Sequence, residues 1–251
     1  MILDDLEKRL EETGDLEDFN KTISNLEQGT RNAVKLLLGL AHEFHSKGLD
    51  KEYVVFGGYA VLMHMVKAIG TEAIARWRGT YDLDIVMDEK VKRDLKSQLE
   101  VISDRKSERY KGKRTIKIRM EEAKEPYKID LRMSEEFSDE PDKIYEDSTE
   151  TIMVYNIPVI VPTLERELKD KLSTSRRVRK DDLDIVNLLG VYYLKKMSPT
   201  KLIRYLEHKE RKRLYDLIKG FEGERFIKEN VLIEIDNKYI NKLKKALKKN
   251  L

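Results

Sequence analysis

Two segments near the middle of the chain alternate strictly between polar and apolar residues, and this pattern restricts the fold more than any other feature. They are residues 115–120, Thr-Ile-Lys-Ile-Arg-Met, and residues 128–133, Lys-Ile-Asp-Leu-Arg-Met. Successive side chains of a β-strand point to opposite faces of the sheet. Both segments are therefore expected to be strands with one buried and one polar face, which argues against a purely helical protein.

The rest of the sequence predicts an α+β fold, in which a mixed sheet flanked by helices is followed by a helical C-terminal portion. Apolar residues at three- and four-residue spacing predict helices in the first part, and Gly48 is placed to end them. The chain is expected to divide into N-terminal helices at 1–48, an α/β core at 49–162 and a helical domain at 163–251. Within the core, the patterns predict strands at 53–56, 83–87, 151–155 and 158–161, and helices at 60–68 and 90–101.

Composition removes several classes of protein. The 251-residue chain has no cysteine, which excludes disulfides, thiolate zinc sites and a cysteine nucleophile. No apolar run approaches the roughly 18 residues that a membrane span needs. The first residues, Met-Ile-Leu-Asp-Asp-Leu-Glu, are acidic where a signal peptide would be basic. We therefore expect a cytoplasmic protein with no membrane association.

Positive charge is concentrated toward the C-terminus. The whole chain carries +3, whereas residues 195–251 carry +9 and residues 1–194 carry −6. A basic end attracts polyanions such as RNA, although a solvated helix surface has the same composition. Four lysines at three- and four-residue steps are expected to form an exposed stripe on one helix. They are Lys238, Lys242, Lys245 and Lys249. Glutamine is rare while lysine and glutamate are abundant, a bias typical of thermophilic proteins.

An acidic pair begins the apolar run at 83–87. On a strand, Asp82 and Asp84 would point to the same face, where two like charges with little water around them are costly. A divalent cation is the usual compensation, and hard oxygen ligands select Mg²⁺ or Mn²⁺. The same tetrapeptide recurs at 182–185 inside a helical pattern, where its two aspartates point apart and cannot hold one ion.

A third acidic residue, Asp130, lies on the polar face of the strand predicted at 128–133. If this strand lies beside the one at 83–87, three carboxylates converge, enough to hold two ions about 3.5–4 Å apart, the spacing used in phosphoryl transfer. Gly57 and Gly58 follow a predicted strand and precede a predicted helix, so their backbone N–H groups can meet an anion. A tight turn is the simpler interpretation of a Gly-Gly pair taken alone.

The order of these elements resembles the nucleotidyltransferase fold of the DNA polymerase β superfamily. It runs Phe56-Gly57-Gly58-Tyr59-Ala60-Val61, then Arg78-Gly79-Thr80-Tyr81-Asp82-Leu83-Asp84-Ile85, then Lys128-Ile129-Asp130. Lys171 and the later Lys180-Asp181-Asp182-Leu183-Asp184 make the chain similar, more narrowly, to the AbiEii-like branch. That branch contains the toxin nucleotidyltransferases of abortive-infection and toxin–antitoxin systems. The resemblance covers residues 50–190.

The resemblance implies a role for each matching residue. Asp82, Asp84 and Asp130 would bind the metal and form the catalytic triad, with Asp130 as a base. The residues that would hold the nucleotide are Gly57, Gly58, Arg78, Thr80, Lys171, Asp181 and Asp184.

Some positions leave alternatives open. Tyr59 stands where many members of the superfamily carry Ser after the glycines. Lys169 is an alternative to Lys171 as the phosphate ligand, and a solvent-facing lysine is an alternative role for Lys171. Arg78 and Thr80 can instead brace the loop before the strand.

Two further groups are expected to be incidental or secondary. One is a basic group that either forms a solvated turn or binds a nucleic-acid backbone: Arg176, Arg177, Arg179 and Lys180. His42 and His45 miss the His-Glu-x-x-His zinc spacing by one residue and are not expected to bind metal.

The sequence therefore predicts a metal-dependent nucleotidyltransferase that moves a nucleotidyl group from an NTP to an acceptor and releases pyrophosphate. The expected acceptor is RNA, for example tRNA, or a protein, and a toxin role implies an antitoxin protein as partner. The alternative is a non-catalytic protein of this fold that binds RNA or a partner protein. Three costly carboxylates argue against that alternative.

Overall fold

The computed structural model describes residues 2–80, 82–106, 113–120, 126–133, 148–174, 179–220 and 225–251. These residues pack into two compact units, 1–162 and 163–251. Within the described part of the chain, no helix has both the length and the apolar composition to cross a membrane.

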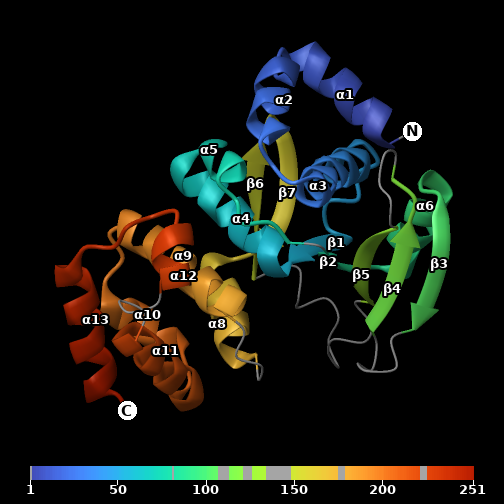
Figure 1. The fold of residues 1–251 in the computed structure, drawn as a ribbon. Helices are drawn as coiled ribbons and strands as arrows, with labels where there is room; N and C mark the ends of the chain where they lie inside the picture. Colours follow the sequence, from blue (N-terminus) through green and yellow to red (C-terminus); the bar gives the residue numbers. More distant parts are fainter. Residues whose placement is uncertain are drawn as a thin grey trace. The chain divides into compact units, whose positions relative to one another are not determined.

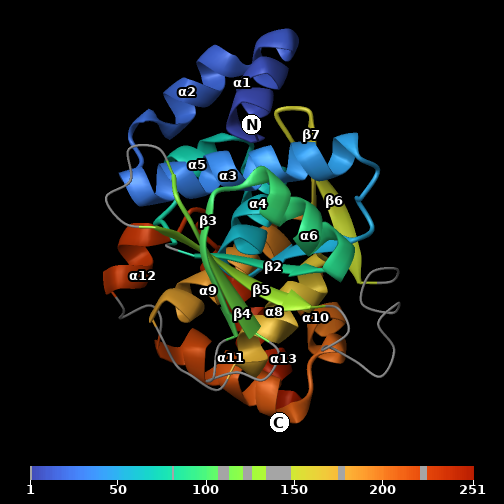
Figure 2. The same cartoon turned by 90° about the vertical axis from the view of Figure 1, so that its right-hand side faces the viewer.

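Three helices open the N-terminal unit. They are α1 (Ile2–Thr13), α2 (Leu16–Ser24) and α3 (Gln28–Ser46). α1 packs closely on α3 at Gly39, where an added Cβ would lie 2.7 Å from Cγ2 of Ile2. α1 and α2 lie outside α3 in both views (Figure 1, Figure 2). Apolar residues surround most of α3, which is why this helix can be covered by α1 and still pack on strands.

A five-stranded mixed sheet follows, in the order β1-β2-β5-β4-β3. Its strands are β1 (Tyr53–Phe56), β2 (Asp82–Met87), β3 (Val101–Lys106), β4 (Lys113–Ile118) and β5 (Tyr127–Met133). Among these described strands, β2 and the central strand β5 are parallel, and the other three pairs are antiparallel. The helices inserted between these strands are α4 (Gly57–Ile69), α5 (Glu72–Ala75) and α6 (Glu89–Gln98).

The sheet has one apolar and one polar face where β2, β5 and β4 meet. Leu83, Ile129 and Ile116 are completely buried. Their neighbours along each strand are partly or fully exposed and polar, as the alternation in the sequence predicts. In each of these strands, the apolar residues face the core and the alternating polar residues form the opposite face of the sheet.

The helix predicted at 90–101 is too long. α6 ends at Gln98, and Val101 begins the edge strand β3, which the sequence did not predict. Val101 continues the helical spacing of Val91 and Leu95, so the pattern alone could not separate the two elements. Pairing of β3 with β4 decides the outcome, because it satisfies backbone groups that a longer helix would leave at the edge of the sheet.

A separate hairpin, β6 (Thr149–Val154) and β7 (Ile157–Pro162), completes this unit. Its two-residue turn has φ of 48° at Tyr155 and 58° at Asn156, the left-handed values that a tight hairpin turn requires. The Tyr155 hydroxyl donates to Asp18 at 3.0 Å and thereby fixes the turn to α2. β7 contacts both β1 and α3, so the hairpin closes the core beside the main sheet.

The C-terminal unit is helical. It consists of α8 (Leu164–Ser173), α9 (Arg179–Leu194), α10 (Pro199–Tyr205), α11 (His208–Gly220), α12 (Arg225–Asn230) and α13 (Asn237–Lys249). α13 packs on α10 and α11 and buries Ile240, Leu243 and Leu247. Its lysine stripe is exposed, as predicted. The predicted α+β fold, with a mixed sheet flanked by helices and a helical C-terminal portion, is confirmed.

Candidate metal and nucleotide site

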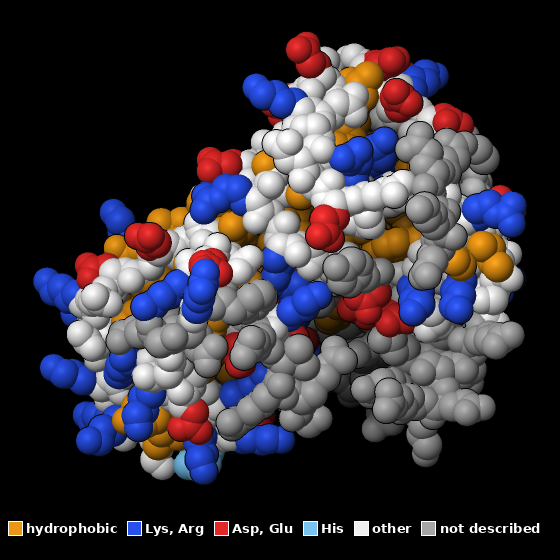
Figure 3. All heavy atoms as spheres, viewed as in Figure 1, with side chains coloured by type: hydrophobic (Ala, Val, Ile, Leu, Met, Phe, Trp, Pro, Cys, Tyr) orange, Lys and Arg blue, Asp and Glu red, His pale blue; other side chains and the backbone are white. Residues whose placement is uncertain are grey.

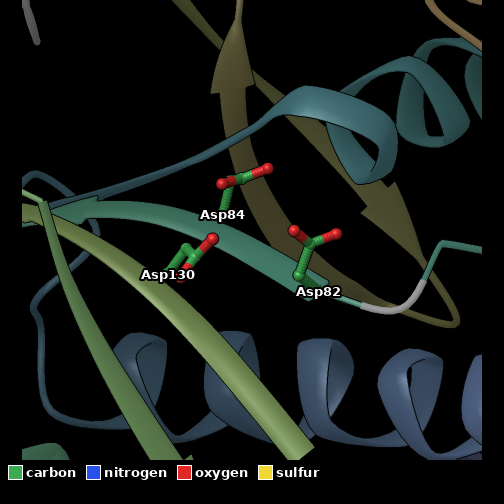
Figure 4. Close-up of side chains that lie close together, drawn as sticks. All are labelled: Asp82, Asp84 and Asp130. Atoms are coloured by element: carbon green, nitrogen blue, oxygen red, sulfur yellow. The ribbon is translucent and has the colours of Figure 1, made fainter. Parts of the chain in front are cut away.

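Three carboxylates meet on the polar face of the sheet (Figure 4). Asp82 and Asp84 come from β2 and Asp130 from β5, where the parallel register pairs Asp84 with Asp130. One carboxylate oxygen of each residue lies within 4.8 Å of the other two, and all three residues are partly buried. The strand at 128–133 thus lies beside the strand that carries the acidic pair, and the three like charges converge.

Two threonine hydroxyls hydrogen-bond to this cluster. Thr115, on β4, donates to Oδ1 of Asp130 at 2.7 Å. Thr80, in the loop before β2, donates to Oδ1 of Asp82 at 3.2 Å. Each bond fixes one oxygen of a carboxylate and so restricts how the side chain can rotate.

Sequence reasoning did not identify Thr115. The signal was present in the alternation of residues 115–120, which places Thr115 on the polar face with Lys117. What the sequence lacked was the pairing of β4 with β5, which sets Thr115 directly opposite Asp130. Pairing partners that are far apart in the chain cannot be read from local patterns.

Gly57 lies against the carboxylate of Asp84. Its φ is +70°, and a Cβ added there would lie 2.7 Å from Oδ2 of Asp84. Gly57 is also the first residue of α4, and the preceding Phe56 provides no side-chain cap for the helix. The first N–H groups of an α-helix have no partner within the helix, and the partial positive charge of a helix start favours an anion nearby.

The loop before β2 is braced from several sides. Tyr59, the residue after the two glycines, is completely buried and donates its hydroxyl to the backbone oxygen of Thr80 at 3.1 Å. Arg78 donates to the backbone oxygen of Gly79 at 2.8 Å. Gly58 is close to the same loop, since a Cβ there would lie 3.3 Å from Cγ2 of Thr80. Tyr59 therefore supports the loop that carries Thr80.

A second charged cluster lies within the C-terminal unit. Nζ of Lys171 is 2.7 Å from Oδ2 of Asp184 and 3.6 Å from Oδ1 of Asp181. Asp184 is completely buried and only 11% of the Lys171 side chain is exposed. Lys171 is therefore not a solvent-facing lysine. Lys169 instead lies at the surface, paired with the exposed Glu207 at 2.9 Å.

The carboxylates of this cluster control the protonation of Lys171. Burial lowers the pKa of Lys171, but the negative charges of Asp184, Glu167 and Asp181 outweigh it and leave the pKa above its usual value. Lys171 therefore stays charged at neutral pH. The tetrapeptide at 182–185 lies on a helix, so its two aspartates point in different directions. Asp184 faces Lys171, while Oδ1 of Asp182 lies 3.7 Å from a terminal guanidinium nitrogen of Arg213.

Other predicted residues lie apart from these clusters or outside the described chain. Arg176 and Arg177 are outside the described residues, and Lys180 is exposed at the start of α9. His45 hydrogen-bonds to Asp50 at 2.9 Å. Within the described residues, the group of acidic or histidine side chains able to hold a metal ion is the one formed by Asp82, Asp84 and Asp130.

The donor set of the triad fits a hard divalent cation. All of its ligand atoms are carboxylate oxygens, which Mg²⁺ and Mn²⁺ prefer over softer metals. The charge that the three carboxylates bring to a partly buried surface is costly without a cation. The three carboxylates, which could hold a metal ion, therefore lie next to a helix start that could meet an anion.

Comparison with known proteins gives structural neighbours only. No protein-family model matches the chain, and no curated protein matches its sequence. Among solved structures, it is similar to a candidate nucleotidyltransferase from H. pylori, with a TM-score of 0.49 and 14% identity over 89% of this chain and 95% of that one. JHP933 from Helicobacter pylori has a TM-score of 0.49 and 16% identity over 88% and 91% of the two chains.

A third similar structure is an antigenic nucleotidyltransferase-like protein from Paracoccidioides brasiliensis. Its TM-score is 0.47, with 14% identity over 81% of this chain and 94% of that one. All three identities are below the level at which function is shared, and the TM-scores are below 0.5. Function is therefore inferred from the geometry of the site.

Proposed function

We propose that the protein is a metal-dependent nucleotidyltransferase that transfers a nucleotidyl group from an NTP to an acceptor hydroxyl. The observation that carries the proposal is the convergence of Asp82, Asp84 and Asp130 beside the start of α4 at Gly57. Phosphoryl transfer needs a carboxylate cluster for cations and donors for phosphate oxygens side by side. In this proposal residues 49–162 are the catalytic core, flanked by helices at 1–48 and a helical domain at 163–251.

Backbone groups of the core would bind the nucleotide. The N–H groups at Gly57 and Gly58 would donate to oxygens of the triphosphate, aided by the positive end of the α4 dipole. Arg78 and Thr80 lie in the loop that contacts Gly58 and would shape the same phosphate pocket. Because Gly57 has no side chain, the Asp84 carboxylate can lie directly against the start of α4.

The chemistry follows from the charges. Mg²⁺ or Mn²⁺ bound by the three carboxylates would neutralise phosphate charge and increase the acidity of the acceptor hydroxyl. The acceptor oxygen would form a bond to the α-phosphorus while the bond from the α-phosphorus to the bridging oxygen breaks, releasing pyrophosphate. Asp130 would receive the acceptor proton on its carboxylate, and Thr115 would hold that carboxylate in place.

Lys171, Asp181 and Asp184 form the second group that we assign to nucleotide binding. Their mutual contacts keep the lysine charged in a partly buried position, where it could meet a triphosphate oxygen only by exchanging contacts with Asp184. Burial makes Lys171 a better candidate for the phosphate ligand than the surface-paired Lys169, because a buried cation interacts more strongly with phosphate.

The acceptor is proposed to be an RNA such as tRNA, or a protein. Support for RNA comes from the exposed lysine stripe on α13, which has no ion-pair partner among the described residues. The toxin role, with an antitoxin partner, and membership of the AbiEii-like branch are proposed from the resemblance of the sequence motifs alone. A cytoplasmic location is proposed because the sequence has no apolar run long enough for a membrane span.

The proposal is tested by measuring pyrophosphate release from each of the four NTPs, with Mg²⁺ or with EDTA, in the presence of total RNA or total protein as acceptor. We expect release with at least one NTP that EDTA and Asp84→Asn both abolish. If Mg²⁺ gives no release with any NTP and either acceptor, the non-catalytic alternative replaces the enzyme.

A further inference from the structure

Two lysines face each other on the polar side of the sheet, next to the carboxylates. Lys128 on β5 and Lys117 on β4 are paired directly across the antiparallel strands, and both are exposed. Lys128 is also the register neighbour of Asp82 on β2. Figure 3 shows acidic side chains over β2 with basic side chains beside them over β4 and β5.

Like charges directly opposite each other in an antiparallel pair destabilise a sheet, because their Cβ atoms are about 4.5–5.5 Å apart. Neither lysine side chain forms an ion pair or hydrogen bond with another described residue, even though Lys128 lies beside Asp82. Neutral residues at these two positions would avoid the repulsion between the lysines. An unpaired lysine pair of this kind is stabilised when an anion binds between the two ammonium groups.

The position of the two lysines in the sheet indicates which reactant they would contact. The strand order places β1 on one side of β2, and β5 and β4 on the other. Gly57 follows β1, so the proposed triphosphate site and the two lysines lie on opposite sides of the aspartates. In an in-line displacement, the attacking and leaving oxygens are on opposite sides of the phosphorus. The lysines are therefore on the acceptor side.

We propose that Lys117 and Lys128 form a phosphate-binding subsite that holds the phosphodiester backbone of a single-stranded nucleic-acid acceptor. This inference rests on the proposed function, because that function places the triphosphate at Gly57. The two ammonium groups neutralise the backbone phosphates next to the reactive hydroxyl and orient that hydroxyl toward the carboxylates. Because the contacts are to phosphate, the subsite binds without base specificity.

The test uses Lys117→Gln, Lys128→Gln and the double variant of the full chain. The matched control is Lys51→Gln, which removes an exposed lysine from the turn before β1. The probes are a short fluorescent oligouridylate, measured by anisotropy over a series of salt concentrations, and a non-hydrolysable NTP with Mg²⁺. Thermal unfolding without ligand accompanies each variant.

A single-strand phosphate contact contributes about 0.7 to the slope of log affinity against log salt. Each lysine variant should therefore flatten the slope by about 0.7 and weaken oligouridylate binding about fourfold at ~0.15 M salt. The double variant should lose about 15-fold. NTP binding and the Lys51→Gln control should match the wild type, and the unfolding temperature should stay level or rise because repulsion is removed.

Three results overturn the subsite: an unchanged oligouridylate slope in the double variant, no oligouridylate binding by the wild type, or weakened NTP binding in place of weakened oligouridylate binding. The last result would assign the lysines to the triphosphate. A wrong proposed function would give a different result. The wild type would then release no pyrophosphate, while the lysine variants would still weaken oligouridylate binding.

Discussion

Replacing Gly57 by alanine should separate the stability of the fold from its capacity to bind metal. With φ at +70°, alanine at this position costs about 1–2 kcal/mol of backbone strain. The smaller conformational entropy of unfolded alanine offsets about 0.4–1 kcal/mol of that cost. The net loss of about 1 kcal/mol corresponds to a fall of about 2–4 °C in the unfolding temperature for a unit of this size.

The effect on the site should be larger. The new Cβ would lie 2.7 Å from Oδ2 of Asp84, whereas ordinary contact begins at 3.4 Å, so the carboxylate must rotate away. Mg²⁺ requires ligand oxygens at about 2.0–2.1 Å in near-ideal geometry, so a displaced ligand is poorly tolerated. We expect at least a ~10-fold loss of Mn²⁺ affinity, as for other changes that misorient a metal ligand.

Gly58→Ala is the matched control for this variant. Gly58 has no positive φ, and its added Cβ would meet Cγ2 of Thr80 at 3.3 Å, which needs a small adjustment. Alanine also favours the helix by up to about 1 kcal/mol, so stability should be unchanged or higher. Mn²⁺ binding is followed by electron paramagnetic resonance of the free ion. Wild-type affinity in Gly57→Ala, or an equal loss in Gly58→Ala, would refute the reasoning.

Three further outcomes are expected. Asp82→Asn and Asp84→Asn should each abolish Mn²⁺ binding while the ligand-free unfolding temperature stays level or rises, because one of three crowded charges is removed; a large drop in both would show that the pair is structural. Thr115→Val should weaken Mn²⁺ binding about 10-fold and Thr115→Ser should restore it; equal loss in both variants would indicate a packing defect. The pKa of Lys171 is raised above 10.5 because its carboxylate neighbours outweigh the effect of burial, and burial raises the pKa of Tyr59 above 10.0. Groups with a raised folded-state pKa stabilise the protein fully below the unfolded-state value and lose that contribution as pH rises. Unfolding temperature, measured by circular dichroism, should therefore fall steeply above about pH 10, and an unfolding temperature that stays level above that pH would contradict this.

The local elements of the site could be predicted from the sequence, because each depends on residues that are adjacent in the chain. The alternation around Asp130 and the apolar run after Asp82 set which face each aspartate occupies, and the structure places them on that face. The Gly57 turn also follows from its neighbours, since a strand and a helix meet there.

The pairing of distant segments was not accessible. That β5 lies between β2 and β4, and that Thr115 meets Asp130, depends on contacts made across the sheet. The edge strand β3 was hidden because Val101 fits both the end of a helix and the start of a strand. For Lys171, sequence spacing left a surface position open, and the partners that bury it come from the next helix.

The most direct test of the central claim follows the phosphate itself. The protein is incubated with Mg²⁺, acceptor and NTP labelled either at the α-phosphorus or at the γ-phosphorus, and the label is followed in acceptor and in pyrophosphate. We expect α-label to enter the acceptor, γ-label to appear only in pyrophosphate, and both signals to be lost in Asp82→Asn and Asp130→Asn. Transfer of γ-label to the acceptor, or transfer of α-label that survives the loss of these carboxylates, would contradict the central claim.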